Sequence, residues 1–159
     1  MTRKFGAIDL IAVGKMRTKH WLQAQQDYEK RLGFYTSFQL MEVKDFVGRG
    51  LPDGTAMQKE GELLLKGAAQ ANRLVLLSPT GRQLTSPGLA DWLREGMERN
   101  GRFAFLLGGP LGFSDEVIAA SHEQLALSPL TFTHELARVI FMEQLYRAFT
   151  IMHGEQYHK

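Results

Sequence analysis

Short apolar runs alternate with longer amphipathic segments along the whole chain. Five runs have the composition of buried β-strands and span residues 5–13, 37–43, 73–77, 103–107 and 125–127. Between them, the spacing of apolar residues predicts helices over 21–32, 56–71 and 86–100, a short helix after Ser114, and a last helix over 134–152. Because strands alternate with helices throughout, the sequence predicts a single α/β domain over residues 1–159, with a mostly parallel sheet flanked by helices on both faces.

Local signals place several element boundaries. The sequence Ser-Pro-Thr-Gly at 78–81 is typical of a turn and is expected to stop the third strand. Ser86, followed by a proline, predicts a capped helix start, and Ser114 predicts another. The segment 44–55 contains three glycines and a proline, so we expect it to form a loop.

The last predicted helix is apolar on nearly every side. Its apolar residues are Leu136, Val139, Ile140, Phe141, Met142, Leu145, Tyr146, Phe149, Ile151 and Met152. Such a helix must be covered on most sides. It is either an ordinary core helix or part of a two-fold homodimer interface. The interface is favoured, because one small domain rarely covers its terminal helix so completely.

Composition is that of a globular protein, with 44% hydrophobic and 23% charged residues. No apolar run has the length of a membrane span, the first residues lack the features of a signal peptide, and cysteine is absent. We therefore expect a cytoplasmic protein with no membrane partner. A net charge of +2 is only weak support for nucleic-acid binding. Six basic residues gather around the first strand: Arg3, Lys4, Lys15, Arg17, Lys19 and His20.

A glycine-rich segment, residues 108–112, follows the fourth strand and exposes main-chain N–H and C=O groups. Its spacing matches neither the dinucleotide fingerprint nor a P-loop. In parallel sheets, ligands bind beyond the carboxyl ends of strands, here at Leu77-Ser78-Pro79, Leu107-Gly108-Gly109 and Leu127-Ser128. The sequence therefore predicts a small-molecule pocket built mostly from main chain. The lack of a cationic side chain in 108–112 favours a neutral or adenine-like ligand over a phosphate.

Few side chains form a recognisable catalytic or metal-binding group. His153 and His158 are five residues apart without acidic or thiol partners, so no metal site is expected. Arg138 and Arg147 lie on a largely apolar helix, so each must either form an ion pair within the protein or serve a functional contact. Glu143 is spaced to pair with Arg147. A structural role and a contact with RNA or substrate both remain open for the arginines.

Six segments, spread over essentially the whole chain, carry a family resemblance. They are Ile-Ala-Val-Gly-Lys at 11–15, Lys-Glu-Gly-Glu at 59–62, Leu-Leu-Gly-Gly-Pro-Leu-Gly at 106–112, Leu-Ser-Pro-Leu-Thr-Phe at 127–132, Glu-Gln-Leu-Tyr-Arg-Ala at 143–148 and Tyr-His-Lys at 157–159. In this order and at this length, the chain resembles the SPOUT-class RNA methyltransferases of the RlmH group, which modify large-subunit ribosomal RNA.

The resemblance implies an α/β fold with a SPOUT-type trefoil knot at the C-terminus, which general topology rules alone disfavour. It also implies that the knotted region binds S-adenosyl-L-methionine. On the family's pattern, the cofactor-binding residues are Leu77, Gly108, Gly109, Ser128, Pro129, Leu130, Thr131, Phe132 and Thr133. The family usually has proline where this chain has Thr133, so the stiffness of this loop is expected to differ.

The implied reaction is methyl transfer to N3 of a pseudouridine in 23S rRNA, within the assembled ribosome, by a homodimer and without a metal. The N3–H group is a weak acid, so a positioned base or nearby cations must assist. The candidate catalytic residues are Arg147, His134, Tyr157 and His158. Two alternatives remain: a non-catalytic, ribosome-associated RNA-binding module with the same fold, and a small nucleotide-binding regulator, which the missing P-loop disfavours.

Overall fold

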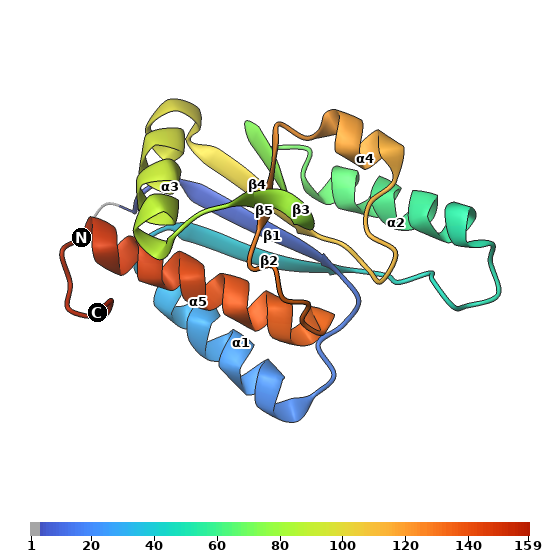
Figure 1. Cartoon of the computed structure of the whole chain (residues 1–159), viewed down its shortest axis with the longest axis horizontal. Coiled ribbons are helices and arrows are strands. Elements are labelled where there is room, and N and C mark those ends of the chain that lie inside the picture. Colours follow the sequence, from blue (N-terminus) through green and yellow to red (C-terminus); the bar gives the residue numbers. More distant parts are fainter. Residues whose placement is uncertain (1–3) are drawn as a thin grey trace.

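The structure, a computed structural model, describes residues 4–159 and contains one five-stranded sheet (Figure 1). The strand order is β2-β1-β4-β3-β5, and every neighbouring pair is parallel. The strands are β1 (Ala7–Val13), β2 (Ser37–Val43), β3 (Arg73–Gln83), β4 (Arg102–Leu107) and β5 (Glu123–Ala126). The predicted parallel α/β sheet is confirmed. The trefoil knot stays a prediction.

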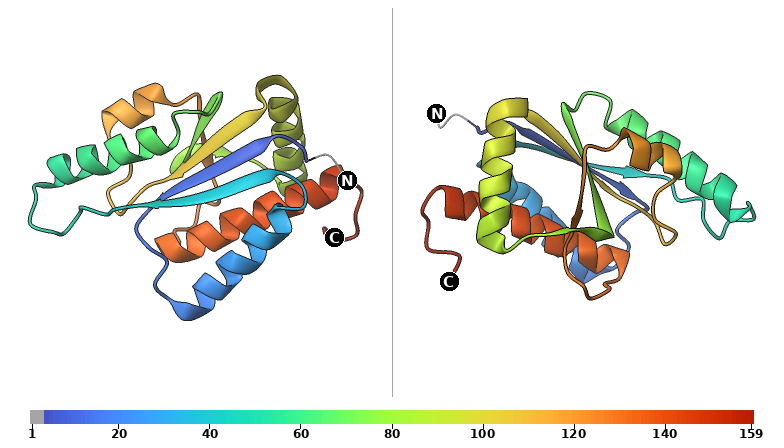
Figure 2. Two further views of the ribbon diagram at one scale, coloured as in Figure 1. Left: turned by 180° about the vertical axis from the view of Figure 1, so that it is seen from behind. Right: turned by 45° about the horizontal axis from the view of Figure 1, so that its top comes forward.

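Helices cover both faces of the sheet, as predicted (Figures 1 and 2). One face carries α1 (Lys19–Leu32), α3 (Ser86–Asn100) and α5 (His134–Met152), and the other carries α2 (Asp53–Gly67) and α4 (Asp115–Ala120). Side chains alternate along a strand, so Leu10 of β1 packs in the first core and Ile11 in the second. Burial on both faces explains why the central parts of the inner strands are mostly apolar.

The third strand extends beyond its predicted end. Leu77 and Arg82 of β3 both pair with Leu125 of β5, so residues 78–81 form an irregularity within one strand. A Cβ on Gly81 would lie 2.6 Å from the backbone of Leu125, which shows how closely β5 passes this glycine. The prediction that Ser-Pro-Thr-Gly stops the strand is wrong, because these turn-forming residues bulge out of a strand that then resumes its pairing.

The helix starts follow the expected chemistry with one difference. The Ser114 hydroxyl accepts a backbone N–H at 3.4 Å and caps α4, as predicted. At α3 the cap is Thr85 and not Ser86, and the Thr85 hydroxyl accepts a backbone N–H at 3.0 Å. This places the following proline within the first turn, where a missing N–H costs little. The helix predicted over 56–71 spans Asp53–Gly67, so the preceding loop is shorter than expected.

Helix α5 is covered largely by its own chain. It lies against the sheet between α1 and α3, and Phe141, Leu145 and Phe149 are almost fully buried (Figure 1). The core-helix explanation therefore accounts for most of its apolar surface, and the homodimer stays a prediction. No helix within residues 4–159 combines the length and the hydrophobicity that crossing a membrane requires.

The basic residues around β1 are divided between two places. Four are exposed in the segment that follows β1: Lys15, Arg17, Lys19 and His20. Lys4 precedes β1, and Arg3 lies outside the described residues. The backbone N–H of Arg17 donates to Glu135 Oε1, in the first turn of α5, at 2.7 Å. Most of this positive charge therefore lies beside the start of α5.

Candidate functional site

A cavity of about 730 Å³ opens at the carboxyl ends of β4 and β5 and at the bulge of β3. Its volume is typical of small-molecule sites, which range over roughly 300–1,000 Å³. Three segments wall it: residues 77–80, residues 107–113, and residues 127–134 without Pro129. The three strand ends identified in the sequence therefore meet at one cavity, where parallel sheets usually bind ligands.

The segment 108–112 forms a tight loop in which main chain replaces side chains. The Gly112 N–H donates to the Gly109 carbonyl at 3.0 Å, and Gly112 has φ +81°, a conformation that favours glycine. A Cβ on Gly109 would lie 2.9 Å from Glu60 Oε1, which is closer than real Cβ contacts allow. The loop therefore presents bare backbone to the cavity and has no room for a side chain at Gly109.

The segment leading into α5 is fixed by its own hydroxyl groups. Ser128 Oγ accepts the Leu130 N–H at 3.0 Å and closes a small turn, while the Leu130 side chain is 73% exposed. Thr133 Oγ1 accepts the Leu136 N–H at 3.4 Å and caps α5. A proline at 133 has no hydroxyl to form this bond. The residue that departs from the family's usual proline therefore supplies the cap of the last helix.

The residues predicted to bind the cofactor are gathered at this cavity, with one exception. Those that line it are Leu77, Gly108, Gly109, Ser128, Leu130, Thr131, Phe132 and Thr133. Pro129 does not line it. Their contacts with a cofactor stay a prediction. Within residues 4–159, the lining includes no Asp, Glu, Lys or Arg, and no group of three or more potential metal ligands occurs. Such a lining fits an uncharged, nucleoside-like group.

Some cavity residues were not predicted from the sequence: Thr80, Phe113, Ile118, Gln124 and Ala137. Ser78 and Pro79 were assigned both to a turn and to a strand end where a ligand is expected, and they line the cavity. A signal for Thr80 was present, because it follows them in the same turn.

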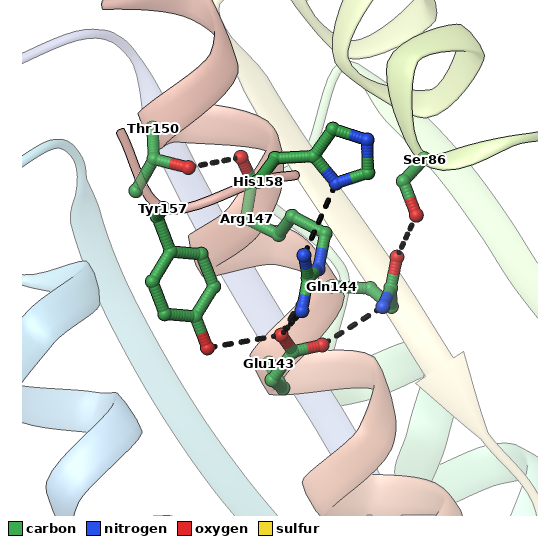
Figure 3. Close-up of polar contacts among 7 residues, drawn as sticks. All are labelled: Ser86, Glu143, Gln144, Arg147, Thr150, Tyr157 and His158. Atoms are coloured by element: carbon green, nitrogen blue, oxygen red, sulfur yellow. Dashed lines mark hydrogen bonds and ion pairs between the residues drawn. The ribbon is translucent and has the colours of Figure 1, made fainter. Parts of the chain in front are cut away.

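A second group of polar side chains surrounds Glu143, which lies midway along α5 (Figure 3). The Glu143 carboxylate accepts hydrogen bonds from Arg147 Nη2 at 2.6 Å, Arg147 Nε at 3.0 Å, Tyr157 Oη at 3.1 Å and Gln144 Nε2 at 2.8 Å. Arg147 Nη1 lies 3.1 Å from His158 Nδ1. An arginine N–H can only donate, so His158 Nδ1 accepts and its ring carries the proton on Nε2. We call these residues the Glu143 cluster.

Electrostatics within the Glu143 cluster favour a protonated tyrosine. Burial, and then the negative charge of Glu143, raise the pKa of Tyr157 above its ordinary value. The guanidinium carbon of Arg147 lies 4.9 Å from the centre of the Tyr157 ring, a cation–π contact. Near neutral pH, Tyr157 is therefore suited to donate a hydrogen bond or to stack. It is poorly suited to accept a proton.

The structure does not bring the four candidate catalytic residues together. His134 lines the cavity at the first turn of α5, whereas Arg147, Tyr157 and His158 lie in the Glu143 cluster. With a rise of about 1.5 Å per residue, the helix separates positions 134 and 147 by about 20 Å. One chain therefore cannot place all four side chains at one reacting atom.

Arg138, whose role the sequence left open, is part of the core. It is 1% exposed, and its Nη1 donates to Glu42 Oε2 at 2.6 Å and to Gln25 Oε1 at 3.2 Å. Its Nη2 donates to the Gly14 carbonyl at 2.9 Å. These bonds tie α5 to α1 and to the ends of β1 and β2. Of the two possible roles, the structure supports the structural one.

The parallel sheet, the cavity at its strand ends and the family comparison define a class of protein. The chain belongs to the SPOUT methyltransferase family, since the model described as predicted SPOUT methyltransferase matches residues 7–158. Its curated relatives include proteins named ribosomal RNA large subunit methyltransferase H. That of Anaeromyxobacter sp. (strain K) is 44% identical over 154 residues, covering 96% of this chain and 99% of the relative. That of Parabacteroides distasonis is 38% identical over 153 residues, covering 95% and 98%.

Solved structures share the fold at low sequence identity. A probable methylase family protein from Haemophilus influenzae Rd KW20 has a TM-score of 0.58 and 12% identity, and the match covers 96% of this chain and 70% of that one. A probable methyltransferase from Bordetella pertussis Tohama I has a TM-score of 0.58 and 16% identity, covering 91% and 97%. These likenesses support the fold.

Proposed function

We propose that this protein is an S-adenosyl-L-methionine-dependent methyltransferase that methylates N3 of a pseudouridine in 23S rRNA. The observation that carries the proposal is the cavity at the strand ends, because residues matching the family's cofactor pattern line it. The relatives named ribosomal RNA large subunit methyltransferase H support large-subunit ribosomal RNA as the substrate. We expect the substrate to be the assembled ribosome and the location to be the cytoplasm, where ribosomes are.

The cavity residues would hold the cofactor mainly through the backbone. The main-chain groups of Gly108, Gly109, Ser128 and 130–133 offer donors and acceptors to an adenosine, and Leu77 and Phe132 offer apolar contacts. A lining without Asp, Glu, Lys or Arg fits the uncharged nucleoside. When bound, the cofactor supplies a methyl group that is already activated, so the chemistry requires no metal.

The separation of the catalytic candidates supports a homodimer. We infer that the Glu143 cluster of one subunit completes the cavity of the other, because about 20 Å of helix separates the two groups within one chain. In this arrangement Arg147 stabilises negative charge on the uracil-like ring after N3 loses its proton. Tyr157 and His158 orient the ring by hydrogen bonding or stacking. His134, exposed at the cavity, is our first choice for the proton acceptor.

The basic segment after β1 is the proposed contact for RNA phosphates. Lys15, Arg17 and Lys19 are exposed beside the start of α5, near the cavity residue His134. Phosphate contacts release counterions, so activity should fall as salt concentration rises.

Two measurements test the function. Calorimetry should detect binding of S-adenosylmethionine, and ribosomes that lack the modification should gain one methyl group at the pseudouridine. The alternative, a non-catalytic ribosome-associated RNA-binding module with the same fold, predicts ribosome binding without methyl transfer. A protein that binds ribosomes but leaves them unmodified at saturating cofactor would favour that module.

Mixed dimers test the shared site. Gly109→Glu damages the cavity and Arg147→Ala damages the cluster, and each homodimer should be nearly inactive. A purified heterodimer, made with two affinity tags, retains one cavity and one cluster that are both intact. If they face each other across the interface, activity returns to about half that of the unaltered dimer, whereas an inactive heterodimer contradicts the shared site.

A further inference from the structure

The sequence Lys-Glu-Gly-Glu at 59–62 contains a buried carboxylate that the proposed function does not use. Glu60 lies in α2 and is 2% exposed. Its Oε2 accepts the backbone N–H of Phe46 at 2.7 Å and of Val47 at 3.1 Å. Its Oε1 has no hydrogen-bond partner among residues 4–159. Half of this carboxylate is therefore compensated by the preceding loop, and half is not.

The uncompensated oxygen lies directly behind the cavity wall. It would be 2.9 Å from a Cβ on Gly109, and the backbone of Gly109 lines the cavity. Helix α2 packs closely at this point, since a Cβ on Gly61 would lie 2.7 Å from Ser114 Oγ. The carboxylate is held behind Gly109 by this packing and by its bonds to the loop. Oε1 therefore lies against Gly109, a residue of the cavity wall.

A negative charge in this position acts on whatever occupies the cavity. The cavity lining within residues 4–159 has no Asp, Glu, Lys or Arg to compensate or mask it. Charges separated by protein are screened much less than charges separated by water. Glu60 therefore favours a ligand that brings a positive charge close to Gly109.

We propose that Glu60 is a specificity-determining residue that favours the cationic form of the cofactor over the neutral product. The inference rests on the proposed function. S-adenosylmethionine carries a sulfonium charge, whereas S-adenosylhomocysteine has the same adenosine, ammonium and carboxylate groups and a neutral sulfur. The buried carboxylate stabilises the sulfonium of S-adenosylmethionine and gives no such stabilisation to the neutral sulfur of S-adenosylhomocysteine. Loss of the methyl group thus weakens binding, which helps the product to leave.

The test compares the affinities of both ligands in Glu60→Gln. The glutamine oxygen can keep the bonds to Phe46 and Val47, so the variant removes the charge and preserves the shape. By calorimetry, S-adenosylmethionine should bind about tenfold more weakly, as expected for a charge several ångströms away, whereas S-adenosylhomocysteine should change less than about twofold. Glu62→Gln, an exposed acid on the same helix, removes the same charge and should change neither affinity.

The ratio of the two affinities keeps the test decisive if Glu60→Gln is partly unfolded, because both ligands titrate the same folded fraction. Glu60→Asp, which retains the charge, should retain most of the preference. Equal weakening of both ligands in Glu60→Gln, or no change in either, would overturn the inference and leave the proposed function standing. Failure of the unaltered protein to bind either ligand at millimolar concentration would overturn both.

Discussion

The cavity and the Glu143 cluster lie towards opposite ends of α5 and are built from different parts of the chain. The cavity is walled by glycines, strand ends and a capped helix start, so part of its wall is bare main chain. The Glu143 cluster consists of side chains that bond to one carboxylate. The difference predicts how each fails. A main-chain site is damaged when atoms are added, and a side-chain site is damaged when atoms are removed.

The largest effect is expected from Gly109→Glu, which adds atoms to the cavity wall. The new side chain has no room, because its Cβ would lie 2.9 Å from Glu60 Oε1, and it places a second carboxylate beside the first. We expect S-adenosylmethionine to bind at least about 1,000-fold more weakly, measured by calorimetry, because two buried like charges are strongly unfavourable.

Gly54→Glu is the matched control. A Cβ on Gly54 meets no atom within 4 Å, and an acidic residue in the first turn of α2 is favourable. It should leave cofactor affinity unchanged. Tight cofactor binding by Gly109→Glu would show that the cavity is not the cofactor site.

Arg138→Ala should give the next largest effect, on stability and not on chemistry. The substitution removes a buried guanidinium and the hydrogen bonds that it donates to Gln25, Glu42 and the Gly14 carbonyl. Breaking a buried ion pair costs about 3–5 kcal/mol, and the partial exposure of Glu42 places this case near 3 kcal/mol. Urea denaturation measures the loss. A change below about 1 kcal/mol would contradict the core role of Arg138.

Arg147→Ala, on the same helix, should spare stability and reduce turnover. Arg147 and Glu143 are both partly exposed, so their pair contributes less than about 1 kcal/mol to folding. Losing a cation that stabilises a developing anion should lower the rate of methyl transfer about 100-fold, while cofactor affinity is unchanged. Arg94→Ala removes a more exposed helical ion pair, with Asp91, and should change neither quantity. Full turnover by Arg147→Ala would remove this residue from the proposed mechanism.

The sequence predicted the backbone arrangement better than the side-chain arrangement. Hydrophobic periodicity predicted the succession of strands and helices along the chain, because that succession depends on local pattern. The general rule for parallel sheets then predicted that Leu77, Leu107 and Leu127 meet at one edge of the sheet. The prediction that residues 78–81 end the third strand was wrong, because β3 pairs with β5 on both sides of the bulge and β5 lies far along the chain.

The two arginines show why side-chain roles could not be predicted. Arg138 and Arg147 occur in the same helix with similar neighbours in sequence. The burial of Arg138 depends on Gln25 and Glu42, which come from distant segments. Likewise, Glu60 lies in the segment Lys-Glu-Gly-Glu at 59–62, which carries part of the family resemblance. Its position against Gly109 could not be predicted, because it depends on the packing of α2 against the cavity loop. Tertiary contacts of this kind leave no periodic signal.

Thr133→Ala should give the smallest effect. It tests whether the cavity depends on the capping hydroxyl of Thr133 or on the main chain of the same segment. The substitution removes the hydroxyl that accepts the Leu136 N–H, at a distance of 3.4 Å, and leaves the main chain of the segment intact. Loss of such a cap costs about 1 kcal/mol of folding stability, measured by urea denaturation. Because the main chain of this segment keeps its place, cofactor affinity should fall by less than about threefold, an amount smaller than 1 kcal/mol. Thr85→Ala, which removes the corresponding cap of α3 away from this cavity, should cost similar stability and no affinity. A large loss of cofactor affinity in Thr133→Ala alone would show that the hydroxyl itself binds the ligand, and that the cavity depends on a side chain in the same way as the Glu143 cluster.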